Sequence, residues 1–452
     1  MIWSGSLYNL QMSPSASDVS VVTVNWNGLE HLEHLLPSLG PLGCREVVVV
    51  DNGSSDGSLE FLERHHPRVQ VIANRENEGF ANPCNQGARV ATGKVVAFIN
   101  NDTRADRAWL SNALPLLSSD QPCVASRILD WTGERIDYNG SSLQYLGYAV
   151  QKDIGAVVEG VTAGRQVLFP CGGAMLIDRE FFLEIGGFDE TFFAIYEDVD
   201  LGWRIWLRGK QVGYAADSIV YHRGHSTFKG QEQHRTRYLM HRNALLTVIK
   251  NYEEETLERV FPAALLLAIR RAILFSGVDR DSFYLWKETR AGLTRQDPMV
   301  TSRVLDAINQ LVAIDDVISD LPRILEERKK VQQHRERSES DILGLFEDPF
   351  RHIVQDPTYQ SQEAEIISRL GLERIFGQEY SRPRSALADR LEERLTEVKQ
   401  EISRLSYWGH KMLDHPAPPP RTPGLRDFVT TWKREGMAVA WQRLRELVDR
   451  GL

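Results

Sequence analysis

The chain has 452 residues, of which 42% are hydrophobic and 25% are charged. This length suffices for two or three domains with buried cores, and the composition is that of an ordinary globular protein. The formal net charge of −9 argues against general binding to nucleic acid, which requires a basic surface. The four cysteines are scattered and form no CxxC pair, so we expect neither a disulfide framework nor a zinc knuckle, and we place the protein in the reducing cytoplasm.

The N-terminus and the most apolar segment predict neither a leader nor a membrane span. Residues 1–17 lack a basic stretch followed by a long apolar run, so we expect a loose tail and no signal peptide. The most apolar segment, 261–278, carries Arg270 and Arg271 at its centre, where charge is costly in lipid. We therefore expect a buried or interfacial helix there.

Residues 18–240 alternate between strand and helix patterns. Apolar, β-branched runs predict strands at 19–24, 46–50, 69–73 and 94–99, with helices between them. Strands that are apolar throughout and separated by helices indicate a mostly parallel sheet covered on both faces. The expected fold class is therefore α/β, with a doubly wound sheet whose ligands bind beyond the carboxyl ends of its strands.

Each of these four strands ends in a polar cluster. The clusters are 25–27 (NWN), 51–54 (DNGS), 74–77 (NREN) and 100–102 (NND). We expect them to converge on one edge of the sheet. Asp102 lies just past a strand, where a carboxylate can bind Mg²⁺ or Mn²⁺. One carboxylate cannot hold such an ion alone, so the other ligands would include phosphate oxygens of a substrate.

Two later stretches carry further candidate groups. Glu197 and Asp198 lie at the start of a predicted helix, where the helix dipole stabilises acids, so a purely structural role stays open. An ionised carboxylate there could equally act as a general base. A short predicted strand ends in His222, with His225 three residues on. These imidazoles could bind a metal ion or a phosphate group.

The remainder of the chain has a different texture. Residues 130–168 are rich in turns and tyrosines, which predicts either a substrate-facing flap or an irregular edge of the domain. From residue 241 onwards long helical patterns dominate, among them 299–335 and 384–412. We therefore expect a largely α-helical C-terminal region over 241–452, in one or two parts with a break near 328–345.

Eight stretches together resemble the motif set of a known enzyme family. They are VVTVNWNG (21–28), VVVVDNGSSDGS (47–58), NEGFANPCNQGA (77–88), FINNDT (98–103), CGGAMLIDRE (171–180), GGFDETFF (186–193), YEDVDLGWR (196–204) and VYHRGHST (220–227). In this order and spacing they resemble inverting glycosyltransferases of family 2, which have the GT-A fold, and most of all their rhamnosyltransferase-like branch. The resemblance covers the region 18–240.

The resemblance implies a role for each matching residue. A nucleotide pocket would be lined by Thr23, Asn25, Asp51, Asn77, Gly79, Phe80, Asn85 and Asn101. The donor sugar and diphosphate would lie against Gly172, Gly173, His222 and His225. Asp102 and His222 would bind a divalent cofactor, Mg²⁺ or Mn²⁺. Asp198 would be the catalytic base, with Glu197 beside it.

Two positions depart from the pattern of the family. Asn100 stands where the metal-binding DxD motif has its first acid, so metal binding is expected to be weaker or to need bound nucleotide. Asn52 stands where many members carry a second Asp, which leaves the nucleobase open. The branch favours dTDP-rhamnose as the donor, and UDP- or GDP-sugars stay open.

The resemblance implies sugar transfer from this donor to a hydroxyl of a glycan, a lipid-linked saccharide or a protein, in the synthesis of bacterial surface polysaccharides or glycoconjugates. The helical region could form a homodimer, bind the acceptor or make peripheral contact with the inner face of a membrane.

Two alternative functions are weighed against this one. A nucleotidyltransferase would need a glycine-rich, basic phosphate loop after the first strand, but NWNGLEHLEHL has one glycine and neither lysine nor arginine. The other alternative is a scaffold or membrane-recruitment protein that retains a weakly active transferase domain, which Asn100 and the helical region motivate.

Overall fold

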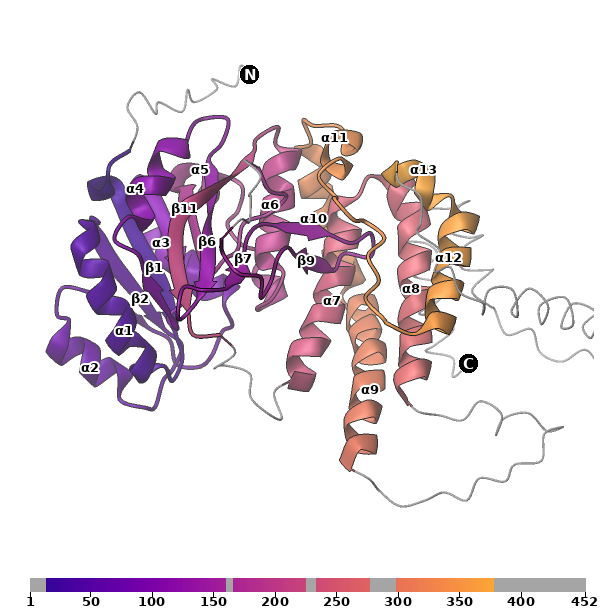
Figure 1. The fold of residues 1–452 in the computed structure, drawn as a ribbon, viewed down its shortest axis with the longest axis horizontal. Coiled ribbons are helices and arrows are strands. Elements are labelled where there is room, and N and C mark those ends of the chain that lie inside the picture. The colour runs from indigo at the N-terminus through magenta and orange to yellow at the C-terminus, as the bar shows by residue number, and fades with distance from the viewer. Residues whose placement is uncertain (1–13, 160–165, 225–232, 277–297, 378–452) are drawn as a thin grey trace, which may run out of the picture. The chain divides into compact units, whose positions relative to one another are not determined.

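The computed structural model describes residues 14–159, 166–224, 233–276 and 298–377 (Figure 1). Contacts divide the chain into two compact units. The first runs to Arg351 and includes residues 374–377, and the second includes residues 352–373. The expected boundary at residue 240 falls inside α7 (Gln233–Asn251), and the division into a domain at 18–240 and a helical region at 241–452 stays a prediction.

A mixed sheet of nine strands, among the described residues, forms the centre of the first unit (Figure 1). Its strands follow the order β3 (Gln70–Ala73), β2 (Glu46–Asp51), β1 (Val19–Asn25), β4 (Val95–Ile99), β10 (Ala174–Asp178), β6 (Cys123–Asp130), β11 (Val212–His222) and β5 (Thr103–Ala105), with β7 (Ile136–Tyr138) beside β6. Strands β1 to β4 are parallel to one another. They confirm the four predicted strands and the α/β class.

The parallel strands are connected by helices α1 (Leu29–Leu39), α2 (Ser58–His65) and α3 (Ala81–Val90). The leucines of α1 recur at helical spacing, and four of them are buried. The β-branched runs of β1 and β4 are almost wholly buried, as apolar strands of a covered sheet must be. Parallel pairing puts Asn25 opposite Asp51, so the carboxyl ends of these strands lie at one edge of the sheet.

The second half of the sheet is mixed in direction. Strand β10 runs antiparallel to β4 and β6, whereas β11 is parallel to β6. The turn-rich segment adds β7 and a hairpin of β8 (Ser141–Leu143) and β9 (Ala149–Gln151). Its tyrosines at positions 138, 145 and 148 are buried, and the Tyr145 carbonyl accepts a hydrogen bond of 2.9 Å from the Tyr252 hydroxyl. The described part of this segment therefore packs onto helices, as an edge of the domain does.

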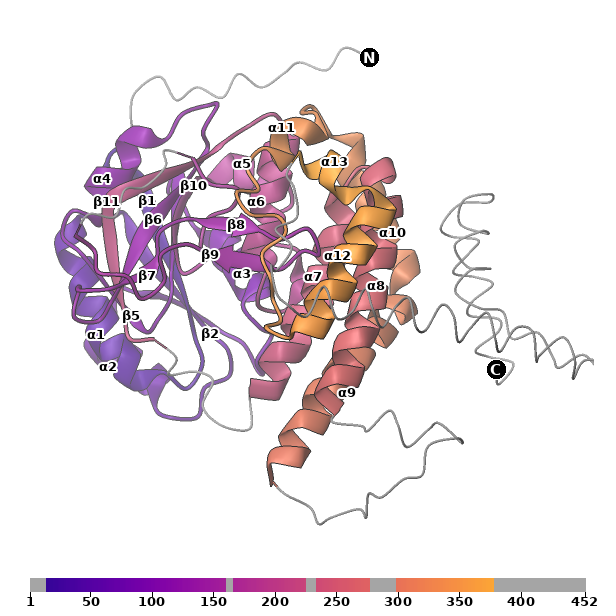
Figure 2. The same cartoon turned by 45° about the vertical axis from the view of Figure 1, so that its right-hand side comes forward.

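Helices make up the rest of the described chain. Beside the sheet lie α4 (Trp109–Ala113), α5 (Arg179–Glu184) and α6 (Glu197–Leu207), and the helical region continues from α7 with α8 (Glu254–Ser276), α9 (Pro298–Ser319), α10 (Leu321–Gln333) and α11 (Glu339–Leu343). Two more follow, α12 (Pro357–Leu370) and α13 (Leu372–Phe376). Helix α7 contacts α6 as well as α8, α9 and α10 (Figure 2). It therefore lies between the sheet and the other helices of the first unit.

The helical patterns that fall on the described residues are confirmed, although their bounds differ from the predicted ones. The pattern at 299–335 is broken between α9 and α10, where Pro322 lies in the first turn of the new helix. The pattern at 384–412 lies outside the described residues. The most apolar segment lies in α8, whose Arg271 is 3% exposed, as expected of a buried helix. In the described ranges, no helix combines the length and the apolar character that crossing a membrane requires.

Candidate active site

The carboxyl ends of β1, β2 and β4 bring three of the four polar clusters together. The Asn25 amide group donates to Asp51 Oδ2 at 2.9 Å, and its carbonyl oxygen accepts from Asn101 Nδ2 at 3.0 Å. The second oxygen of Asp51 accepts from the backbone N–H of Ser54 at 2.8 Å. Thr23, one pleat back on β1, has a buried hydroxyl without a hydrogen-bond partner in the described residues. An orphaned hydroxyl at this edge suits a polar ligand that enters there.

A close approach of the backbone fixes the first loop. A Cβ atom at Gly28 would lie 2.3 Å from Asn101 Nδ2 and 2.6 Å from Asn25 Oδ1, so only glycine fits against this amide pair. The single glycine of the loop therefore lets the chain turn directly over the end of β1, and it leaves the amides in place.

The fourth cluster joins the site through Asn52. Its amide donates to the Gly79 carbonyl at 2.6 Å and to Asn77 Oδ1 at 3.3 Å, while its oxygen accepts from Asn74 Nδ2 at 3.1 Å. An aspartate at position 52 could not donate these two hydrogen bonds, which explains why an amide is present there. The sequence identifies Asn52 as a departure from the family pattern but does not reveal this structural role.

Asn85 lies elsewhere than the other predicted nucleotide residues. It is buried on α3, where its amide donates to the Phe188 carbonyl at 2.8 Å and its oxygen accepts from the Phe188 N–H at 2.9 Å. Its amide also reaches Glu190 Oε1 at 3.1 Å. The side chain thus holds the loop before residue 190, and its part in nucleotide binding stays a prediction.

His222 and Asp102 meet at the end of β11. The imidazole Nε2 lies 3.1 Å from Asp102 Oδ2, and Nδ1 lies 2.5 Å from Asp137 Oδ2. Burial alone would lower the pKa of His222, but the hydrogen bonds to Asp102 and Asp137 outweigh it and raise the pKa to about 10. The ring is therefore a cation between two carboxylates when no metal ion is bound.

The donor set at this place fits a divalent cation that a substrate shares. A metal-binding histidine commonly donates its other ring N–H to a carboxylate, and Asp137 stands in that position on Nδ1. Nε2 and the Asp102 carboxylate, which face each other, could then be two ligands. In the described ranges, no three His, Cys, Asp or Glu side chains are grouped to hold an ion by themselves. Phosphate oxygens would therefore have to complete the coordination.

Asp198 and Glu197 open α6 on the other side of the site. Asp198 Oδ2 accepts a hydrogen bond of 2.8 Å from the Gly172 N–H. Burial raises the pKa of Asp198, and the backbone N–H groups around it oppose this rise only in part. Burial and then the neighbouring Asp198 raise the pKa of Glu197 much further, and Glu197 Oε2 has no hydrogen-bond partner in the described residues. The pKa values of the two acids therefore differ, and Asp198 loses its proton at a lower pH than Glu197 does.

The turn at Gly172 and Gly173 connects the two sides. The Gly173 carbonyl accepts from the Asn100 N–H at 3.0 Å, and a Cβ at Gly173 would lie 3.0 Å from Asn100 Nδ2. A Cβ at Gly172 would lie 3.1 Å from the Phe80 ring and 3.5 Å from Glu197 Oε1. The turn therefore runs between the cluster that contains Asp102 and the start of α6.

A segment with unusual backbone geometry leads into Asp198. Phe193, Ile195 and Tyr196 have φ angles of 62°, 71° and 72°, which L-residues adopt at a cost. The Phe193 carbonyl accepts from the Phe80 N–H at 2.6 Å, and a Cβ at Gly79 would lie 2.3 Å from that carbonyl oxygen. The strained segment is therefore docked onto the start of α3, beside the nucleotide cluster.

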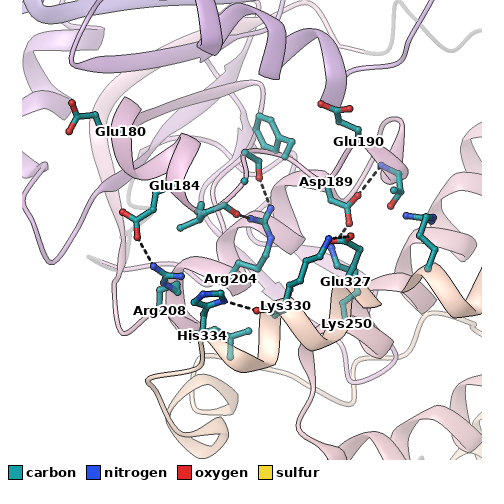
Figure 3. A pocket seen from close by; sticks show the side chains of 18 residues that line it. Glu180, Glu184, Asp189, Glu190, Arg204, Arg208, Lys250, Glu327, Lys330 and His334 are labelled. Atoms are coloured by element: carbon teal, nitrogen blue, oxygen red, sulfur yellow. Dashed lines mark hydrogen bonds and ion pairs between the residues drawn. The ribbon is translucent and has the colours of Figure 1, made fainter. Parts of the chain in front are cut away.

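One predicted residue and one cavity are not part of the site described above. His225 lies outside the described residues, so its proposed role has no structural account. A cavity of about 1190 Å³ opens at the end of α6 remote from Asp198 (Figure 3). Some of its charged side chains pair with one another, for example Arg208 with Glu184 at 2.6 Å. None of the residues predicted for the site lines this cavity.

Comparisons with known proteins show what this chain is similar to. A family model described as glycosyl transferase family 2 matches residues 20–186. A pre-mycofactocin glycosyltransferase of Mycobacterium tuberculosis is 29% identical over 212 residues, which cover 46% of this chain and 43% of that protein. An N-acetylglucosaminyl-diphospho-decaprenol L-rhamnosyltransferase of the same organism is 28% identical over 250 residues, which cover 47% of this chain and 79% of that protein. The chain thus spans less than half of the first of these relatives.

Solved structures give a weaker likeness. A crystal structure of GalNAc-T7 with UDP, GalNAc and Mn²⁺ is 18% identical, with a TM-score of 0.43, over 54% of this chain and 50% of that one. The family match covers a continuous segment that contains Asp51, Asp102 and Gly172. Asp198 and His222 follow the matched segment. The likeness to glycosyl transferase family 2 therefore holds for the domain at residues 20–186.

Proposed function

We propose that this protein is an inverting glycosyltransferase, which moves a sugar from a nucleotide-diphosphate donor to a hydroxyl group of an acceptor. The observation that carries the proposal is the position of Asp198. Its carboxylate accepts a hydrogen bond from the Gly172 N–H, and the carbonyl of the next residue, Gly173, accepts from the Asn100 N–H. The turn at Gly172 and Gly173 thus separates the Asp198 carboxylate, which would act as the base, from the cluster that would bind a diphosphate. A donor sugar would lie along this turn.

The polar edge of the sheet would hold the nucleoside. Asp51, Asn25 and Asn101 form one hydrogen-bonded group there, and the orphaned Thr23 hydroxyl lies in the same strand. Asn77, Gly79 and Phe80 would form the opposite wall. Gly172 and Gly173 would lie beneath the donor sugar.

Asp102 and His222 would hold Mg²⁺ or Mn²⁺ together with the diphosphate of the donor. A bound ion of this kind supplies positive charge where negative charge develops on the leaving group. Asp102 also anchors the loop after β11, because its backbone carbonyl accepts from the Arg223 N–H at 3.0 Å. The chain therefore keeps the Asp102 and His222 side chains facing each other before any ligand arrives.

Asp198 would act as the general base. The acceptor oxygen attacks the anomeric carbon as its proton passes to the Asp198 carboxylate, and the bond from that carbon to the diphosphate breaks. One displacement from the opposite face inverts the anomeric centre, without a protein nucleophile. Glu197 stays protonated beside it, so the site does not gather a second negative charge next to the base.

The donor and acceptor are proposed by likeness. The branch of the family favours dTDP-rhamnose, in line with the relative named as an L-rhamnosyltransferase, and UDP- or GDP-sugars remain alternatives. The acceptor would be a glycan, a lipid-linked saccharide or a protein. We propose that the protein works in the cytoplasm, with homodimer formation and peripheral membrane contact as further proposals for the helical region.

Nucleotide binding provides the first test. The melting temperature is measured against a panel of nucleoside diphosphates and nucleotide-sugars, with and without Mn²⁺ or Mg²⁺, because a ligand of the native state raises its stability. Product release is then followed for the donor that binds. A shift for one nucleotide that grows with metal, together with transfer, would support the proposal. Absence of any shift would favour the scaffold alternative.

A further inference from the structure

Helix α7 reaches the strained segment that leads to Asp198. Asn243 on this helix is completely buried. Its Nδ2 lies 3.0 Å from the Phe192 carbonyl oxygen, 2.9 Å from that of Ala194 and 2.6 Å from that of Ile195. One amide group thus lies within hydrogen-bond distance of three backbone carbonyls of segment 192–196. Through it, the helical half of the chain contacts the segment that leads to Asp198.

The three carbonyls converge because the segment takes an unusual path. Phe193, Ile195 and Tyr196 have positive φ angles, which are costly for L-residues and persist only where the surrounding structure imposes them. A buried carbonyl without a donor adds a further cost. The Asn243 amide supplies a donor to the Ala194 and Ile195 carbonyls, and a second donor to the Phe192 carbonyl, which also accepts from the Ala194 N–H at 2.7 Å. It therefore stabilises the strained path over a relaxed one.

Lys250 holds the chain on both sides of this segment. It lies seven residues after Asn243 and so faces the same side of α7. Its Nζ lies 2.5 Å from Asp189 Oδ2 and 2.8 Å from Asp200 Oδ1, and Figure 3 shows it pointing towards Asp189. Asp189 precedes segment 192–196, and Asp200 follows Asp198 by two residues. Helix α7 therefore fixes the stretch of chain before the base and the helix that carries it.

We propose that Asn243 and Lys250 are positioning residues of the transferase, which keep segment 192–196 strained so that the Asp198 carboxylate stays at the Gly172 N–H. The proposal rests on the proposed role of Asp198 as the base, although the clamp itself does not depend on it. It gives the first helix of the helical region a direct part in catalysis. A role in folding stability alone would predict no change in turnover per correctly folded molecule.

The sharpest test is Asn243→Asp, which keeps the shape and replaces the donor by a carboxylate that faces three carbonyl oxygens. We expect the turnover per bound nucleotide to fall about 100-fold, as a displacement of the base by about 1 Å can produce. Turnover is measured at saturating donor, because the same segment accepts the Phe80 N–H and the donor KM can change with it. Hydrogen exchange of the amides at 192–198 should become faster.

A matched control is Asn309→Asp on α9. Asn309 is also buried, at 7% exposure, and its amide also donates to a backbone carbonyl, that of His234, at 2.9 Å. It does not contact segment 192–196 in the described structure, so turnover per bound nucleotide should match the wild type. If Asn243→Asp fails to fold, Asn243→Ala provides the same comparison with a smaller change.

Hydrogen exchange at 192–198 and turnover per bound nucleotide together distinguish a failure of the clamp from a failure of the proposed function. Faster exchange at 192–198 with a selective loss of turnover supports the clamp as a catalytic device. Unchanged exchange, or a loss of turnover that only follows the loss of nucleotide-binding sites, overturns it. A wild-type protein that transfers no sugar from any donor overturns the proposed function and the catalytic role with it, whereas faster exchange in the variant would still show the structural clamp.

Discussion

At the scale of single residues, His222 shows how groups far apart in the chain fix one side chain. Pairing of β11 with β6, and of β6 with β7, brings His222 beside Asp137, while the turn after β4 brings Asp102 to the other ring nitrogen. The two carboxylates leave the ring one orientation. Nε2 therefore points at the place where the diphosphate of a donor would be bound.

Asp137→Asn should weaken metal binding. An amide oxygen still accepts from Nδ1 but without the charge that makes the ring a better ligand, and the loss of such a partner typically lowers metal affinity about 10- to 100-fold. Mn²⁺ titration in the presence of a nucleoside diphosphate measures this affinity. Asp153→Asn is the control, since Asp153 bonds Asn139 at 2.8 Å and not His222. Equal Mn²⁺ affinity in Asp137→Asn and the wild type would exclude His222 as an oriented ligand.

Turnover should depend on the ionisation of Asp198. Burial raises the pKa of its carboxyl to about 6, above the usual value of about 3.9, so the group gains a proton and stops acting as a base while the pH is still mildly acidic. We expect kcat to fall about tenfold per pH unit below about 6. A pH profile between 5 and 8 checks this. Asp198→Asn should abolish transfer at every pH and leave nucleotide binding nearly intact.

Residue patterns could predict only part of this site. Asp51, Asp102, Asp198 and His222 follow strands or open a helix, where the sequence marks them. Asp137 lies in a turn-rich stretch, and its role depends on strand pairing that no local pattern reveals. The same limit applies to Asn243, because its three partners are backbone carbonyls of a distant segment.

At the scale of elements, the parallel strands could be predicted because each is a short β-branched run between helical patterns. The direction of β10 could not, since a run of apolar residues reads the same in either direction. The packing of α7 on α6 was also hidden, because the residues that join them are polar. Lys250, Asp200 and Arg204 form a buried ionic group, in which Arg204 Nε lies 2.7 Å from Asp200 Oδ2. From the sequence alone, charged residues of this kind would be expected on the solvent-exposed face of a helix.

Lys250→Met should destabilise the protein strongly. Burial alone would raise the pKa of Asp189, but the Lys250 ammonium outweighs it and holds that pKa below its usual value, so the carboxylate relies on this partner. Removal of one partner from a buried ion pair costs about 3–5 kcal/mol. Urea denaturation measures the change in the free energy of unfolding. Lys329→Met, whose pair with Glu326 is exposed, should match the wild type, and an equal effect of both changes would contradict a special role of Lys250.

At the scale of the whole molecule, α7 joins the domain that matches the family 2 model to the helices that follow. The Trp203 ring of α6 lies edge-on to the Tyr252 ring, with centroids 4.9 Å apart, and both side chains are buried. Contacts of this kind continue the core of the domain past residue 240. A boundary drawn from motifs alone ends before them, since the motifs end with the last residue that carries chemistry.

A chain shortened to residues 1–240 should therefore fail to form a stable, nucleotide-binding domain. It loses Asn243, Lys250 and Tyr252 together, which leaves Asp189 and Asp200 without Lys250 and exposes the Trp203 ring. A chain of residues 1–377 keeps the whole first unit and should retain the thermal shift with nucleotide. Circular dichroism and the same nucleotide panel compare the two. Normal nucleotide binding by the 1–240 chain would show that the domain folds without α7, and the clamp on segment 192–196 would then be dispensable for assembling the nucleotide site.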